Sequence, residues 1–354
     1  MATHSKPATV TFDRLQAYIA MALAKVGMPE ADAHQVATLM ASADLQGSDG
    51  HGVLRLPQYV KRIRAGGINL RPNIRVVHER PGSAVIDGDN GMGHLVASRV
   101  VQVAIDKARH TGVAWAGARL SNHAGPASLY ARMPIEHDMI GLYFAVGNAN
   151  HLPPWGGAEM LLSTNPIAAG IPAGVEPPVV LDMATTVAAY GKVKAKIKAG
   201  EMMPEGWMID RKGQPLLDPK RADEGFLLPI GGHKGYGLAL MVGLLAGTLQ
   251  GAAMGRDVID FNKDSASPTN TGQAILVIDL HAFGDPAQFK ARVDTLVRDL
   301  RGSERLEGVE RIWLPGEQSH LRRERYRVEG IPVSPGVVAD IAAMAREIGV
   351  EPLI

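Results

Sequence analysis

The chain of 354 residues contains no cysteine. This absence excludes disulfide bonds, thiolate nucleophiles and zinc sites built on thiolates, and it permits a reducing compartment. An excess of charge of one sign is also missing, because 37 basic residues nearly balance 36 acidic residues and leave a net charge of +1. The charge balance therefore gives no electrostatic reason to expect a nucleic acid or an anionic membrane surface as a partner.

The first ten residues do not resemble a secretory signal. Residues 1–10, MATHSKPATV, lack a basic start followed by an apolar stretch, and we interpret them as a short flexible lead. One apolar segment, residues 236–253, approaches the length of a membrane span, but Gly243, Gly247 and Gly251 interrupt it. This pattern favours a buried helix over a membrane span, and we expect a cytoplasmic protein.

The length predicts about two domains, which could be interleaved. Helical patterns fill the chain up to residue 72, and strand and helix patterns alternate beyond it. We therefore predict a helical N-terminal region over residues 1–72, packed with about residues 320–354. An α/β region is predicted over residues 73–319, with further divisions near residues 115 and 260 as an option.

The first candidate for chemistry is the stretch 48–55, SDGHGVLR, in a connection between two predicted helices. His51 lies between two glycines that give it little steric cover, and a histidine can exchange a proton near neutral pH. Arg55 follows four residues later, where a helical start would point it the same way, and its planar fork suits a carboxylate. The alternative is an ordinary histidine in a turn.

Polar residues lie at or just after the ends of three predicted strands, at residues 113–120, 140–146 and 179–186. They are His123, Asn148 and Asp182. The ends of strands are the usual place for ligand chemistry in α/β proteins, so these side chains could line one pocket. An ordinary turn or a helix cap explains each of them as well.

Two glycine-rich stretches invite comparison with nucleotide-binding loops. Residues 88–93 read GxxGxG after a predicted strand, which is not the GxGxxG of a Rossmann fold. Residues 231–237 open the apolar helix, where backbone amides and Lys234 could hold a phosphate. A P-loop phosphotransferase is disfavoured, because the Ser or Thr that ends a Walker loop is absent.

A lysine-rich stretch lies between the two glycine-rich stretches. Four lysines alternate with apolar residues at positions 192, 194, 196 and 198, which predicts a solvated basic edge, with a phosphate-facing lysine as the alternative. Residues 203–218 are rich in turn residues and predict a surface excursion.

A series of segments resembles the malate/L-lactate dehydrogenase family, which is unrelated to the Rossmann-type lactate dehydrogenases. The segments follow the family's order over about residues 11–335. They read GHGVLRLPQYV, SNHAGPASLYA, PPWGGAE, STNPIA, LDMATTVAAYGKV, PEGWMIDRKGQPLLDP, LPIGGHKGYGLALMV, GQAILVIDL and LPGE. The family includes malate, sulfolactate and ureidoglycolate dehydrogenases, diketogulonate reductase and reductases of cyclic imino acids.

The resemblance implies an α/β (α+β) fold that is not a Rossmann fold, with a mixed, largely antiparallel sheet and a homodimeric assembly. It implies reversible hydride transfer between NAD or NADP and C2 of a small 2-hydroxy or 2-oxo acid, or of a cyclic imino acid. Neither the preferred cofactor nor the individual substrate follows from it, and no metal is expected.

The resemblance also assigns site residues. His51 is the implied proton donor or acceptor, Arg55 the carboxylate ligand, and His123 a second candidate for the proton; Asp182 would hold an imidazole or a cofactor group. Further substrate-binding positions are Ser48, Asn148 and Thr164. The implied cofactor-binding positions are Asn122, His123, Asp182, Met183, Ala184, Thr185, Thr186, His233, Lys234, Gly235 and Gly316.

Gly50 departs from the family pattern, which usually has a serine directly before the catalytic histidine. Here the nearest serine, Ser48, stands two positions earlier. A missing hydroxyl could alter substrate binding or the behaviour of His51. A second hypothesis is therefore a family member that binds the nucleotide with little catalysis and acts as a sensor or interaction protein.

Overall fold

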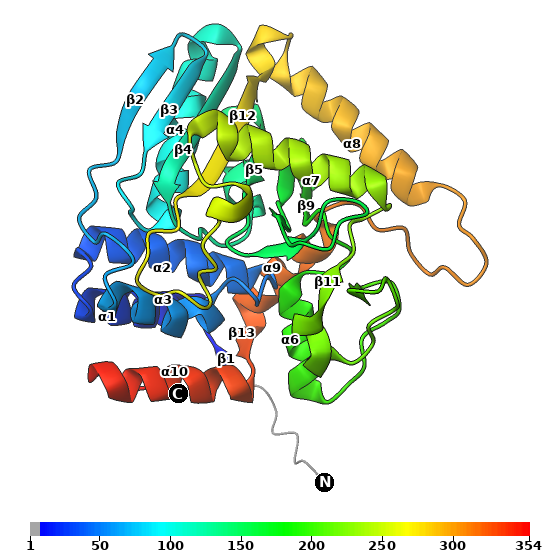
Figure 1. Ribbon diagram of the computed structural model, residues 1–354. Helices are drawn as coiled ribbons and strands as arrows, with labels where there is room; N and C mark the ends of the chain where they lie inside the picture. The colour runs from blue at the N-terminus through cyan, green and yellow to red at the C-terminus, as the bar shows by residue number, and fades with distance from the viewer. Residues whose placement is uncertain (1–7) are drawn as a thin grey trace.

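The computed structural model describes residues 8–354 and has a seven-stranded sheet at its centre (Figure 1). The strand order is β2-β3-β4-β12-β5-β8-β9. Within this sheet β3 and β4 pair in parallel, and the other neighbouring strands are antiparallel. The predicted mixed, largely antiparallel sheet is confirmed. Residues 1–7, which hold most of the predicted lead, lie outside the described residues.

The three strands predicted at residues 113–120, 140–146 and 179–186 are present, and the third is shorter than predicted because it ends at Met183. The bounds of all seven strands of the sheet follow. They are β2 (Arg75–Arg80), β3 (Ser83–Asp87), β4 (Val113–Ser121), β5 (Met139–Ala145), β8 (Ile167–Ile171), β9 (Val179–Met183) and β12 (Thr271–Asp279). Outside the sheet, β6 (Asn150–Leu152) pairs with β7 (Leu162–Ser163).

Helices cover both faces of the sheet. Ile275 and Val277 of β12 share a core with α4 (Gly93–Thr111), whereas Ala274, directly before Ile275, packs with Ala246 of α7 (His233–Ala246). Successive residues of a strand point to opposite faces, so α4 and α7 lie on opposite sides. The short helix α5 (Ser128–Arg132) covers β5, β8 and β9. The edge strand β9 is therefore close to the segment that follows β4.

The N-terminal helices and the last helix form one layer at the edge of the sheet (Figure 1). The side chain of Thr11 accepts a hydrogen bond from the Arg14 amide and caps the first helix. The layer consists of α1 (Phe12–Lys25), α2 (Glu30–Leu45), α3 (Leu56–Arg64) and α10 (Pro335–Ile348), which share one apolar core. In addition, β1 (Ala8–Val10) pairs with β13 (Ile331–Val333). The predicted packing of the N-terminal helices against the C-terminal helix is confirmed, and the domain boundaries stay a prediction.

The lysine-rich stretch is helical. It forms α6 (Tyr190–Ala199), whose Val193 packs in a small core with Met203, Met208 and Leu216. The basic edge inferred from the alternating lysines is therefore wrong about the element, because these lysines lie on a helix. The predicted surface excursion contributes to that core and includes β10 (Met208–Asp210), which pairs with β11 (Gly225–Leu227).

The apolar helix α7 is shorter than its pattern and is buried on one face. Ala239, Val242 and Gly243 are buried, whereas Met241 and Leu245 on the outer face are exposed. Across residues 8–354, the structure contains no helix with the length and apolarity needed to cross a membrane.

The remaining helices are α8 (Pro286–Gly302) and α9 (Glu317–Glu329). Asp285 caps α8 by accepting a hydrogen bond from the Ala287 amide. Gly316 precedes α9 in the left-handed region of backbone space, at φ +83°, which glycine adopts without strain.

Candidate active site

The turn that carries His51 is held by a buried carboxylate. Asp44 of α2 accepts a hydrogen bond of 2.7 Å from the Val53 amide, at the start of the short helix η1 (Val53–Arg55). A Cβ atom at Gly52 would lie 2.0 Å from the Asp44 carboxylate, so the turn requires glycine there. Burial raises the pKa of Asp44 to about 8. The path from α2 to α3 is thereby fixed, and so is the place of His51.

Two predicted histidines stack on each other. The His51 and His123 rings lie 5.3 Å apart with an angle of 13° between their planes, although 72 positions separate them in the chain. Phe261 covers the other face of His123 at 5.0 Å and 5°. The end of β4 and the α2–α3 connection therefore meet at one place, where His123 lies beside His51.

Arg55 lies beside this stack. Its Nε donates to the Gly50 carbonyl at 2.8 Å, and its guanidinium lies over the Phe261 ring at 5.5 Å. No carboxylate pairs with Arg55 among residues 8–354. Arg55 is partly buried, and this burial lowers the pKa of its guanidinium. An anion placed here would supply the missing counter-charge.

The environment keeps both imidazoles neutral. Burial, followed by the charge of Arg55, lowers the pKa of His51 to about 4. Burial also lowers the pKa of His123 well below its ordinary value, assisted by His51, Arg55 and His94. At neutral pH each ring can therefore offer one lone pair and one N–H.

Asp182 lies near the end of β9, and its carboxylate is hydrogen-bonded to a backbone amide and not to an imidazole. Its Oδ2 accepts the Ser128 amide at 2.9 Å. The Ser128 hydroxyl accepts from Gln46 at 3.0 Å, and Gln46 also donates to Ser48 at 3.1 Å. Burial raises the pKa of Asp182, against the Ser128 bonds that lower it. This chain of contacts joins Asp182 to Ser48, and the suggested contact with an imidazole is not formed.

Asn148 and Thr164 support the site through backbone contacts. The Asn148 carbonyl accepts the Phe261 amide at 3.0 Å, and its side chain donates to Thr271. The Thr164 carbonyl accepts both the amide and the hydroxyl of Thr185 at 2.9 Å. Asn148 thus positions the ring that stacks on His123.

Asn122 is buried and its side chain is fully occupied. It donates to Asn90 and to the Gly91 carbonyl at 2.9–3.1 Å and accepts from Thr269. These bonds tie the end of β4 to the glycine-rich turn 88–93. The GxxGxG pattern therefore marks a structural turn, and a cofactor contact through the Asn122 amide would break these bonds.

The predicted cofactor-binding segments converge around β9. The Thr185 carbonyl accepts the Ile230 amide at 3.0 Å, which places the strand end 182–186 beside the loop 229–232. The hydroxyls of Thr185 and Thr186 are buried and bonded to backbone carbonyls. Gly316 packs so tightly on β9 that a Cβ atom there would lie 2.7 Å from the Val180 carbonyl. Met183 and Ala184, between these contacts, are half-buried.

The N-terminus of α7 is open to an anion. Gly231 and Gly232 lead into it with φ of +58° and +65°, and no side chain caps the first turn. His233 and Lys234 are exposed there, and a Cβ atom at Gly235 would lie 2.0 Å from the Ile230 carbonyl. Uncapped amides of a long helix and a lysine together suit a phosphate group.

Three residues of the site were missed in the sequence. Tyr59 follows Arg55 by one helical turn, a spacing that indicates a shared face. His94 follows the glycines of the turn 88–93, and its buried ring meets Tyr59 edge-on at 5.6 Å. Phe261 lies in a loop and gave no signal, because its contact with His123 spans 138 positions.

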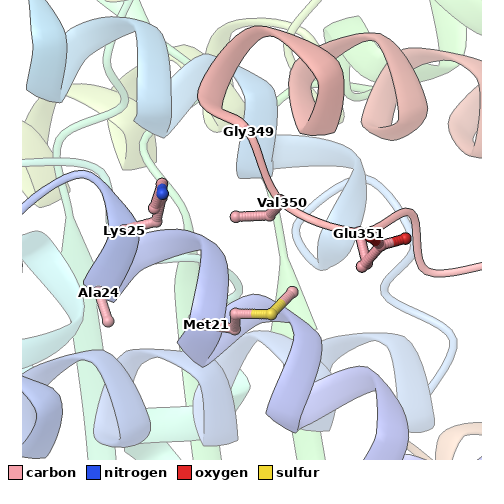
Figure 2. A pocket seen from close by; sticks show the side chains of 6 residues that line it. All are labelled: Met21, Ala24, Lys25, Gly349, Val350 and Glu351. Carbon is pink, nitrogen blue, oxygen red and sulfur yellow. The ribbon is translucent and has the colours of Figure 1, made fainter.

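A surface hollow of about 680 Å³ lies elsewhere, between α1 and the chain after α10 (Figure 2). It is lined by Met21, Ala24, Lys25, Gly349, Val350 and Glu351. None of the predicted site residues lines it, so it is separate from the histidine stack.

His94 should make the stability of the protein depend on pH. Both of its ring nitrogens are buried without a hydrogen-bond partner. Burial lowers its pKa from 6.5 in the unfolded chain to about 3. The unfolded state therefore binds the proton first, and stability falls as the pH drops from 6.5 towards 3. We expect His94→Leu to reduce the slope of unfolding free energy against pH by up to about 1.4 kcal/mol per pH unit in this window.

Denaturant unfolding between pH 7 and pH 4 measures this slope. The same substitution at the exposed His78 is the control and should leave the curve in place. An unchanged slope in His94→Leu would show that the histidine titrates alike in both states. The buried carboxyl of Asp44 contributes to the slope of unfolding free energy against pH with the opposite sign. This contribution is the same in the parent, in His94→Leu and in the control, so it cancels in the comparison.

Comparisons with known proteins find relatives along most of the chain. The family model described as malate/L-lactate dehydrogenase matches residues 10–342. A malate dehydrogenase from Pyrococcus horikoshii is 40% identical over 96% of both chains. A solved malate dehydrogenase structure from the same organism has a TM-score of 0.90 with 37% identity, covering 98% of this chain and 97% of that one. A Δ1-pyrroline-2-carboxylate/Δ1-piperideine-2-carboxylate reductase from Pseudomonas putida is 32% identical over 92% of this chain and 93% of its own length.

Proposed function

The chain belongs to the malate/L-lactate dehydrogenase family, and from this premise we propose that it transfers hydride between NAD or NADP and C2 of a small 2-hydroxy or 2-oxo acid, or of a cyclic imino acid. The observation that carries the proposal is that a neutral His51 lies in the same site as Arg55, whose guanidinium has no carboxylate partner among residues 8–354. One group can move a proton and the other can bind a carboxylate, as a carboxylic acid substrate requires.

Arg55 would bind the substrate carboxylate and so fix the position of C2 beside His51. In the oxidative direction, neutral His51 takes the proton from the hydroxyl or amine nitrogen while hydride leaves C2. In the reductive direction, the proton returns from His51 to the oxygen or nitrogen as hydride arrives at C2. A bound carboxylate offsets the charge of Arg55 that disfavours the imidazolium, so substrate binding prepares His51 to donate.

The residues around β9 fit a nicotinamide cofactor. When bound, the cofactor carries the hydride, and the protein provides position and charge. The uncapped first turn of α7 with Lys234 would hold its phosphates, and the strand end 182–186 together with Gly316 would line its path. These residues suit NAD and NADP alike, and the cytoplasmic location stays a prediction.

A substrate panel tests the proposal. Oxidation of NADH and NADPH should be measured with pyruvate, oxaloacetate, the 2-oxo form of ureidoglycolate and Δ1-pyrroline-2-carboxylate. Turnover with at least one acid is expected. Cofactor binding in a thermal-shift assay without turnover across the panel would instead favour the sensor hypothesis.

Gly50 offers a matched pair of variants. No atom lies within 4 Å of a Cβ atom at Gly50, whereas a Cβ atom at Gly52 meets the Asp44 carboxylate. Gly50→Ser should therefore keep its unfolding free energy within about 0.5 kcal/mol of the parent. Gly52→Ser should lose about 1–3 kcal/mol through overpacking.

The added hydroxyl of Gly50→Ser stands next to His51, so we expect it to change the order of kcat/KM across the acid panel. Unfolding curves and the same panel give both readouts. An unchanged substrate order would mean that the departure from the family pattern has no bearing on substrate choice.

We propose a homodimer formed through the outer face of α7. Met241, Leu244 and Leu245 are exposed on this face, and Leu249 follows just beyond the helix. In Figure 1 the helix runs across the front of the sheet with no other element over it. A contiguous apolar face of this kind is typical of a protein interface, and a second copy of the chain would cover it symmetrically.

Sedimentation equilibrium tests the assembly. The parent protein should have twice the mass of the chain, and Leu245→Glu should shift it to the monomer, because a charge would be buried in the interface. Leu306→Glu in the loop before α9 is the control and should remain dimeric. A monomeric parent, or a Leu245→Glu protein that stays dimeric, would contradict this interface.

A further inference from the structure

Tyr59 connects α3 to His123. It is buried on α3, and its hydroxyl oxygen lies 2.6 Å from Nδ1 of His123. The sequence assigned no role to this tyrosine, and the proton transfer described above does not use it. Its hydroxyl has no other hydrogen-bond partner among residues 8–354.

A second group shows which partner donates. The Gly125 amide also points at Nδ1 of His123, at 3.4 Å. A backbone N–H can only donate, so Nδ1 presents its lone pair and carries no proton. The Tyr59 hydroxyl must then donate to the same lone pair. Burial raises the pKa of Tyr59, so the phenol keeps the proton that this bond needs.

The proton of the neutral His123 ring therefore lies on Nε2. Nδ1 faces Tyr59 and Gly125, and Nε2 is neither hydrogen-bonded nor enclosed in the described structure. The rings of His51 and Phe261 clamp the two faces of His123. A ring held on both faces and at one nitrogen keeps its orientation and its tautomer.

We infer that His123 is a fixed hydrogen-bond donor through Nε2–H, and that Tyr59 is the positioning residue that holds it in this tautomer. The inference rests on the proposed function for what the donor meets: the oxygen or nitrogen on C2 of the substrate, or the carboxamide of the cofactor. A nitrogen that already carries a proton cannot accept another, so His123 is not the base of the oxidative direction.

This assignment separates the two histidines. The Nδ1 atom of His51 is buried without a partner, and its Nε2 keeps access to solvent. No donor of the described structure occupies that nitrogen, so it is free to exchange a proton. His51 thus moves the proton, while His123 stabilises the charge that develops on the substrate.

The tautomer can be read without turnover. In ¹⁵N-histidine-labelled protein, long-range nitrogen–proton spectra distinguish a protonated from an unprotonated ring nitrogen, and His123→Gln identifies the signal. We expect Nε2 protonated and Nδ1 unprotonated, with Tyr59→Phe increasing the other tautomer. A protonated Nδ1 in the parent protein overturns the inference.

Activity gives an independent readout. Glutamine keeps an N–H donor near the place of Nε2 but cannot transfer a proton. His123→Gln should therefore keep the parent's pH profile and lose no more than about tenfold in kcat, the cost of an imperfect hydrogen bond. His51→Gln should lose at least about a hundredfold. The reverse order of the two losses overturns the division of roles.

Tyr59→Phe should lower kcat about 3- to 10-fold, the loss expected for one hydrogen bond, with little change in KM. Tyr18→Phe is the matched control, because Tyr18 is buried in the helical layer and its hydroxyl bonds only the Ile341 carbonyl. It should change neither kcat nor the His123 spectrum. Equal effects of the two variants would reduce Tyr59 to a structural role.

Absence of turnover in the parent would refute the proposed function, and the spectrum would still decide the tautomer.

Discussion

Replacing Arg55 with methionine should reduce kcat/KM for a 2-oxo acid by about 30- to 1000-fold, mainly through KM. The guanidinium is desolvated, lacks a carboxylate partner among residues 8–354 and lies beside the histidine stack. Removing one partner of a buried, hydrogen-bonded charge pair costs roughly 2–4 kcal/mol, which corresponds to this range. Methionine keeps the apolar contact with Phe261, so the loss reports on the charge.

Two comparisons show whether the carboxylate is the group that Arg55 binds. Lys61→Met changes an exposed cation on α3, the helix that follows Arg55, and should leave kcat/KM in place. The amide of the best acid has no negative charge, so Arg55→Met should affect its weak turnover far less. Equal losses for acid and amide would show that Arg55 acts on the fold or the cofactor instead.

His51→Ala should lower kcat by about 100- to 10,000-fold, the usual contribution of a positioned general acid or base. Cofactor affinity should stay within a few-fold, because most of the predicted cofactor-binding positions lie around β9 and at the start of α7, away from the α2–α3 connection. Added imidazole should restore part of the rate, since the deletion leaves room beside His123. Stopped-flow rates with and without imidazole, together with cofactor titrations, measure both effects.

Retained turnover in His51→Ala would remove the histidine from the reaction. A loss of cofactor binding in parallel with kcat would point instead to a collapsed stack, in which His123 had moved. His123→Gln, measured beside it, separates these results because it leaves the imidazole of His51 in place.

Much of the fold follows from local patterns in the sequence. The helical N-terminal region and the three strands predicted at residues 113–120, 140–146 and 179–186 each depend on patterns among neighbouring residues, and the structure places the strand ends within a few positions of the predictions. The prediction of a basic edge at the lysines of α6 was wrong because alternating charges fit a solvated strand. A single buried residue, Val193, fits a helix equally well. A ten-residue segment gives periodicity too little length to decide.

The site residues that could be predicted are those whose functional partners lie close to them in the sequence or whose motif resembles the family's. His51 with Arg55, and a histidine at the end of β4, could be identified from spacing and family resemblance. Phe261 could not, because its contact with His123 depends on how a distant loop returns to the sheet. The expected contact of Asp182 with an imidazole failed for a similar reason, since α5 places the Ser128 amide on that carboxylate.

The most direct test of the account is a single-turnover experiment on the parent protein, with NADH or NADPH mixed with the best acid of the panel. The account predicts that one reduced nicotinamide disappears for each 2-hydroxy acid or cyclic amino acid formed, and that both His51→Ala and Arg55→Met slow this step. Reduced cofactor that binds but persists with every 2-oxo and imino acid would contradict it.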